Sequence, residues 1–105
     1  MHPLNYDHIG IPTKTRKEGM IYFPEYKVWT NDYEKTPYRI EWLFCEKGSP
    51  LHPLIQNSPH IAFLVDDIHK AVKGKKILME PIQYQNYWMA FIEEDGVPVE
   101  FIQPP

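Results

Sequence analysis

Residues 58–67 have the sequence SPHIAFLVDD, which predicts a buried strand followed by a capped helix. Side chains alternate between the two faces of a strand, so the imidazole of His60 shares a face with Ala62. Asp66 or Asp67 is a suitable N-cap for the helix, because a carboxylate accepts a hydrogen bond from a free N–H group of the first turn. The small side chain of Ala62 leaves open space next to the imidazole ring.

The same pattern occurs earlier in the chain, at residues 7–12, with the sequence DHIGIP. His8 begins a short apolar run and shares a strand face with Gly10, while the isoleucines share the other face. An internal repeat constrains the architecture before any fold is assumed. Because the repeating unit is about half of the chain, we expect two similar modules side by side.

Each histidine is followed by a strand-like run that contains a single inward carboxylate. Glu41 follows His8 by 33 residues, and Glu100 follows His60 by 40 residues. The two halves therefore match in order and nearly in length. If a pseudo-twofold axis relates the halves, all four side chains converge.

The pattern predicts an α+β fold in which each half has the order strand, helix, strand, strand, strand. The second half shows its helix after Asp67, whereas the segment 13–19 of the first half is too short for a long helix, so we expect the first helix to be reduced or lost. Strands are expected at about 6–12, 26–30, 38–45, 60–65, 77–84, 87–93 and 97–103. Pro81 predicts that the strand 77–84 lies at an edge. We expect a single domain with module one at about 5–46, a linker at about 47–58 and module two at about 59–103.

Composition excludes several classes of protein. The 105 residues are 43% hydrophobic, which suits one small soluble domain. A net charge of −3 gives no electrostatic reason to bind nucleic acid or an anionic membrane. One cysteine, Cys45, excludes an internal disulfide framework, and no run approaches the roughly 20 apolar residues of a membrane helix. The N-terminus does not resemble a signal peptide, so we expect a cytoplasmic protein.

Two histidines and two glutamates at equivalent positions form a candidate metal site. Mixed nitrogen and oxygen donors suit a divalent transition metal such as Zn²⁺, Ni²⁺, Co²⁺, Mn²⁺ or Fe²⁺. Such a metal would polarise a bound carbonyl and stabilise the enediolate left by proton removal from the adjacent carbon. A glutamate that loosens from the metal could be the base.

Each of these residues also has a purely structural explanation. A histidine at the start of a strand is commonly a hydrogen-bonded structural residue, and a glutamate in an apolar strand can pair with a cation or lie on a solvated face. The doubled pattern is what favours the metal site. Of the other histidines, His2, His52 and His69 are expected at the surface. The basic segment 13–19 is either a solvated loop or a contact for an anionic substrate tail.

The repeated segments resemble the vicinal oxygen chelate superfamily, which includes glyoxalase I and the bleomycin-resistance proteins. The matching segments are residues 7–11 (DHIGI), 40–43 (IEWL), 60–63 (HIAF), 65–68 (VDDI) and 99–102 (VEFI). The resemblance covers nearly the whole chain. Residues 60–68 are its most specific part, and they are also similar to methylmalonyl-CoA epimerase, as is the SPL sequence at 49–51.

The resemblance implies paired βαβββ modules that curl into a mixed-sheet cup around a metal held by His8, Glu41, His60 and Glu100. Glu100 or Glu41 would then be the catalytic base. Extradiol dioxygenases of the superfamily use two histidines and one carboxylate on iron, and His8, His60 and Glu100 could supply that set too. A fourth ligand at Glu41 favours the isomerase-like set.

The resemblance further implies a metal-dependent isomerase, epimerase or lyase, similar to lactoylglutathione lyase or methylmalonyl-CoA epimerase. It would act on a small molecule with vicinal oxygens by proton transfer next to a carbonyl. Two alternatives stay open at this stage: a non-catalytic small-molecule-binding protein like the bleomycin-resistance members, and a structural domain with a relic site. A homodimer is expected, because exchange of modules between chains is common in the resembled family.

Overall fold

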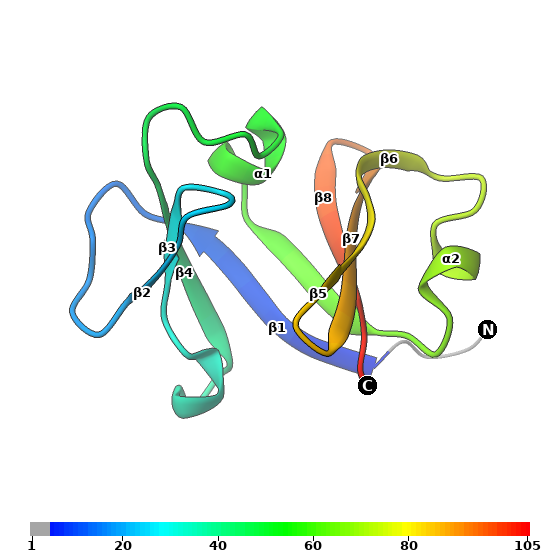
Figure 1. Cartoon of the computed structure of the whole chain (residues 1–105), viewed down its shortest axis with the longest axis horizontal. Helices are drawn as coiled ribbons and strands as arrows, with labels where there is room; N and C mark the ends of the chain where they lie inside the picture. Colours follow the sequence, from blue (N-terminus) through cyan, green and yellow to red (C-terminus); the bar gives the residue numbers. More distant parts are fainter. Residues whose placement is uncertain (1–4) are drawn as a thin grey trace.

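The computed structural model describes residues 5–105, so His2 lies outside the described residues. Eight strands form one mixed sheet in the order β2-β3-β4-β1-β5-β8-β7-β6. The strands are β1 (Asn5–Pro12), β2 (Ile21–Phe23), β3 (Val28–Thr30), β4 (Ile40–Cys45), β5 (His60–Leu64), β6 (Lys76–Tyr84), β7 (Tyr87–Glu94) and β8 (Val97–Gln103). The sheet curls so that its two outer parts stand on either side of the central pair β1 and β5 (Figure 1).

The strand order is the same in both halves when it is counted outward from the centre. β1 pairs in parallel with β4, β5 pairs in parallel with β8, and β1 and β5 are antiparallel to each other. The predicted α+β fold with a curled mixed sheet is therefore confirmed. The two antiparallel central strands bring the two histidine-containing segments side by side.

Helices are few and short. α1 (Pro53–Asn57) lies between the halves, α2 (Ile68–Ala71) follows β5, and a 3₁₀ turn, η1 (Tyr33–Lys35), precedes β4. Asp67 caps α2 as expected, because its side chain accepts a hydrogen bond from the backbone N–H of Lys70. No helix occurs between β1 and β2 in the described chain, which confirms the reduced helix of the first half.

Two hydrophobic clusters stabilise opposite faces of the sheet. Ile68 and Val72 of the α2 region pack on the outer face of the second half, against Ala90, Ile92 and Phe101. The other cluster contains Val28, Leu43, Leu51, Ile55 and Phe91. Phe91 lies between Ala90 and Ile92 on β7, so this second cluster lies on the inner face. α1, which the sequence did not predict, contributes Ile55 to it.

Two strands begin later than predicted. Lys27 and Arg39 have φ values of 48° and 54°, and such left-handed residues interrupt an extended strand. β3 consequently begins at Val28 and β4 at Ile40. β6 lies at the edge of the sheet, as Pro81 predicts, and its register shifts near the proline.

Two cationic side chains lie over tryptophan rings of the first half. The guanidinium of Arg16 lies 4.4 Å from the ring centroid of Trp29, and the ammonium of Lys17 lies 4.7 Å from that of Trp42. Trp29 sits on β3 between two residues of the inner face and so points outward. No helix within residues 5–105 has the length and apolar character needed to cross a bilayer.

Candidate metal centre

The four predicted site residues lie on the four adjacent central strands of the sheet. Gly10 on β1 pairs with both Glu41 on β4 and His60 on β5. Ala62 on β5 pairs with both His8 on β1 and Glu100 on β8. Strand pairing thus places all four side chains on one face of the sheet, the inner face. Glu41 and His60 lie in one row across the strands, and His8 and Glu100 lie in a second row two residues away.

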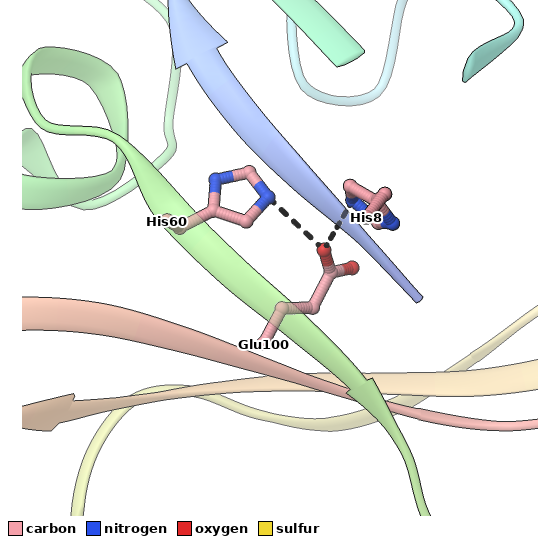
Figure 2. Close-up of side chains that lie close together, drawn as sticks. All are labelled: His8, His60 and Glu100. Carbon is pink, nitrogen blue, oxygen red and sulfur yellow. Dashed lines mark ion pairs between the residues drawn. The ribbon is translucent and has the colours of Figure 1, made fainter. Parts of the chain in front are cut away.

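Three of the four donors form a tight, buried group. Oε1 of Glu100 lies 3.3 Å from Nε2 of His8 and 3.2 Å from Nε2 of His60, and Figure 2 shows the carboxylate reaching between the two imidazoles. One ligand atom from each of the three residues lies within 4.8 Å of the other two. Three donors at this separation can bind one ion between them.

Glu41 lies at the edge of this group. Its Oε1 is 3.4 Å from Nε2 of His8 but 3.9 Å from Nε2 of His60. Its side chain is 18% exposed, compared with 9% for Glu100. The structure therefore brings His8, His60 and Glu100 together most closely and leaves Glu41 nearer to the solvent.

The donor set fits a divalent transition metal. Nε2 of His8 and both ring nitrogens of His60 are buried and have no hydrogen-bond partner in the described structure. Buried polar atoms are usually paired, because leaving one unpaired costs about 1–3 kcal/mol. Two imidazole nitrogens and a carboxylate oxygen are ligands that zinc and its neighbours accept. A cation bound between the two imidazoles would satisfy Nε2 of His8 and Nε2 of His60, whereas Nδ1 of His60 lies on another side of its ring.

The charges of the cluster stabilise one another. Burial opposes the charged form of His8, but the nearby carboxylates of Glu100 and Glu41 outweigh it and raise the pKa of His8 to about 11. Burial likewise opposes ionisation of Glu100, but His60 and His8 lower the pKa of this carboxyl to about 2. A metal and a proton compete for the same imidazole lone pair, so metal uptake is expected to release protons.

Asp7 contacts the candidate centre through His8, and sequence reasoning missed this contact. The register of β1 against β5 shifts between Tyr6 and His8, so Asp7 occupies a β-bulge. The bulge breaks the usual alternation, and both Asp7 and His8 are buried. Nδ1 of His8 donates a 2.8 Å hydrogen bond to Oδ2 of Asp7. This bond places the proton on Nδ1 and leaves Nε2 facing the centre.

Tyr33 and Arg39 complete the support of His8, and sequence reasoning missed them too. The hydroxyl of Tyr33 donates a 2.7 Å hydrogen bond to Asp7, and the guanidinium of Arg39 lies 3.1 Å from its other carboxylate oxygen. The ring of Tyr33 also stacks on the imidazole of His8, with centroids 4.1 Å apart. Burial opposes ionisation of Asp7, but its bonds to His8, Tyr33 and Arg39 lower its pKa. The one sequence signal was the position of Asp7 directly before His8.

Gly10 is required by the position of His60. A Cβ atom at residue 10 would overlap the imidazole ring of His60, which no real contact allows. Gly10, the small residue noted beside His8 in the sequence, here makes room for the imidazole of the other half.

Two hollows, named here in turn the inner hollow and the outer hollow, adjoin the centre and share Glu41, Tyr87 and Glu100. The first has a volume of about 110 Å³ and lies beside His60. Its walls come from both halves and from α1, and comprise Phe23, Tyr26, Val28, Thr30, Leu43, Leu51, Ile55, Met79, Tyr84, Met89 and Phe91 in addition to His60 and the shared residues. The second, of about 180 Å³, lies beside His8 and is also lined by Tyr33 and Ile102.

The remaining candidates lie away from the centre. His52 and His69 are exposed; the first caps α1 and the second packs its ring on Trp88. Cys45 is half-buried against the inner cluster, and burial raises the pKa of its thiol.

Structural comparison bears on the fold. The chain is similar to a hypothetical protein from Bacillus halodurans C-125, with a TM-score of 0.72 and 24% identity over 96% of this chain and 94% of that one. It is also similar to methylmalonyl-CoA epimerase from Mycobacterium tuberculosis, with a TM-score of 0.61 and 15% identity over 96% of this chain and 88% of that one. The shared feature is the fold. The epimerase and the curled sheet fit the vicinal oxygen chelate fold. No protein-family model and no curated protein sequence matches the chain.

Proposed function

We propose that the chain is a member of the vicinal oxygen chelate superfamily and a metal-dependent isomerase, epimerase or lyase of the glyoxalase type. The observation that supports this most is that two buried imidazoles with unpaired ring nitrogens converge with a buried carboxylate. His60 and Glu100 of this group line a mostly apolar hollow. Such a hollow with a few convergent polar groups is typical of a small-molecule site. The epimerase neighbour supports the same class of chemistry.

In this proposal His8, His60 and Glu100 hold the ion. When bound, a divalent metal would supply a Lewis acid that polarises a substrate carbonyl. Glu100 contacts both imidazoles and is buried, which suits a ligand. The substrate would have two adjacent oxygens, one of them the carbonyl.

Glu41 is the better placed of the two predicted bases. Both carboxylates line the two hollows, but that of Glu41 is more exposed than that of Glu100 and lies farther from His60. A carboxylate at the wall can accept a proton from the carbon next to a carbonyl and return it to the same or the neighbouring atom.

The alternative is a non-catalytic protein that binds a small molecule. The inner hollow supports this binding function directly, because five phenylalanine or tyrosine rings line it. These rings would bind the apolar part of a ligand without catalysing a reaction. The two functions separate by proton exchange: an enzyme of the proposed type exchanges the hydrogen next to the carbonyl with deuterium oxide, and a binding protein does not.

Metal analysis tests the centre itself. Purified protein that is loaded and then desalted should contain close to one transition metal ion per chain. Alanine at His60 or Glu100 should abolish uptake with little loss of fold, whereas alanine at the exposed His69 should leave it unchanged. Wild-type protein that takes up no metal would overturn the proposed function.

We further propose that module one (about 5–46) and module two (about 59–103), joined by the linker at about 47–58, build this site together. Wall residues from both modules support the proposal. The homodimer and the cytoplasmic location stay predictions from the sequence.

A further inference from the structure

The wall of the inner hollow carries no fixed positive charge. Fifteen described residues line it, and none of them is lysine or arginine. The outer hollow is likewise lined without either. The charged groups that face the two hollows are the carboxylates and imidazoles of the centre.

Arg16, Lys17 and Arg39 each contact a residue outside the lining of the two hollows. Arg16 and Lys17, from the segment that could have met an anionic substrate tail, lie over Trp29 and Trp42. Val28 and Thr30 both line the inner hollow. Trp29 lies between them on β3 and therefore points to the opposite face of the sheet. Arg39 is paired with Asp7.

The charge of the centre itself would also be balanced. Glu41 and Glu100 carry two negative charges between them, which is the charge that a divalent ion brings with opposite sign. A carboxylate or phosphate on the substrate would therefore enter a low-dielectric hollow with no net positive partner. Burying such a charge without a partner is strongly unfavourable.

The size of the inner hollow limits the substrate further. Its volume of about 110 Å³ is smaller than the roughly 150 Å³ cavity that accommodates benzene in an engineered protein. The wall is mostly aromatic, aliphatic and methionine side chains. It thus suits a short apolar body of a few carbon atoms, with methionine allowing some adjustment of shape.

We propose that this site takes a small uncharged molecule whose two adjacent oxygens face the centre and whose body is a short aliphatic chain. This proposal rests on the metal centre of the proposed function. It disfavours substrates that place a carboxylate or phosphate inside either hollow. The substrate class is then a small hydroxyketone, ketoaldehyde or diketone.

Three matched hydroxamates test the proposal on zinc-loaded protein by titration calorimetry. Butanoyl hydroxamate, succinyl monohydroxamate and 4-aminobutanoyl hydroxamate share the chelating group and chain length, and end in a methyl, a carboxylate and an ammonium group. We expect the methyl-terminated compound to bind at least about tenfold more tightly than the carboxylate compound, because the charge loses its hydration. The ammonium compound should also bind more weakly than the methyl-terminated one.

A second experiment adds a cation to the lining of the inner hollow. Tyr84→Lys places an ammonium group at the lining and should narrow or reverse the preference against the carboxylate compound. Ile82→Lys, on the same strand but exposed and outside the lining, should leave the preference unchanged.

The outcomes separate the two proposals. Equal or tighter binding of the carboxylate compound to zinc-loaded wild-type protein would overturn the substrate class and leave the metal centre standing. If none of the three compounds binds to protein that holds zinc, the substrate class is likewise overturned and the metal centre stands. Protein that holds no zinc would instead overturn the proposed function, on which this inference depends.

Discussion

Nδ1 of His8 donates a hydrogen bond to the carboxylate of Asp7, the residue that directly precedes it in the chain. Neighbouring residues of a regular strand point to opposite faces, so this contact exists because of the bulge at Asp7. The same carboxylate also accepts hydrogen bonds from Tyr33 and Arg39. The orientation of His8 is therefore fixed by a network that spans β1 and the segment before β4.

Asp7→Asn should weaken metal binding. Loss of a carboxylate partner behind a metal-bound histidine typically lowers metal affinity by about 10- to 100-fold. Competition with a chromophoric chelator measures the affinity, and the d–d absorption of Co²⁺ bound to the protein reports the geometry. Asp95→Asn, in the exposed β7–β8 turn, is the matched control. An Asp7→Asn protein with wild-type affinity and an unchanged cobalt spectrum would show that Asp7 does not position His8.

Tyr33→Phe should have a smaller effect than Asp7→Asn. The substitution removes the hydroxyl that donates to Asp7 but keeps the ring that stacks on His8. We expect a loss of metal affinity of less than about tenfold, since one neutral hydrogen bond contributes about 1 kcal/mol. The same chelator competition measures it. A loss as large as that of Asp7→Asn would mean that the hydroxyl, not the stacking, dominates the support.

Gly10→Ala should damage both stability and metal binding. The added methyl group would lie within the imidazole of His60, so the ring or the central strands must move. Overpacking of this kind typically costs about 1–3 kcal/mol of unfolding free energy. Urea unfolding and zinc titration measure the two effects. A Gly10→Ala protein that matches the wild type in both would contradict the observed packing of His60 on Gly10.

The two glutamates should have different roles. Glu100→Gln should abolish tight metal binding, because Glu100 lies between both imidazoles. Glu41→Gln should retain the metal, with at most about a tenfold loss of affinity, and should lose exchange of the substrate hydrogen with deuterium oxide by about 10²-fold or more. Metal analysis and proton NMR read the two properties separately. A Glu41→Gln protein that exchanges normally would exclude Glu41 as the base.

Stability in the presence of a strong chelator should depend on pH in a defined way. The pKa of Glu100 falls from 4.5 to about 2 on folding, so its stabilisation is present above pH 4.5 and is lost as the pH falls towards 2. The pKa of His8 rises from 6.5 to about 11, so its stabilisation is complete below pH 6.5 and is lost as the pH rises towards 11. Urea unfolding should show greatest stability between about pH 4.5 and 6.5 from these two groups. A flat profile from pH 3 to 9 would contradict the proposed charge pairing.

Much of the fold could be predicted because the sequence repeats. The two HI-small-residue segments and the two inward glutamates define strands, faces and order, and the structure places all four side chains on one face. α1 was missed because its five residues, PLIQN, are too few to show helical periodicity. The support of His8 was missed because it depends on a bulge and on contacts between residues 26 and 32 positions apart. The position of Asp7 directly before His8 was the only local signal of that support.

Anomalous diffraction from crystals of the zinc-loaded protein tests the central claim most directly. The account predicts one strong anomalous peak on the inner face of the sheet, within about 2.0–2.2 Å of Nε2 of His8, Nε2 of His60 and a carboxylate oxygen of Glu100. A peak bound elsewhere, or a fully zinc-loaded crystal in which any of these three side chains points away from the metal, would contradict it.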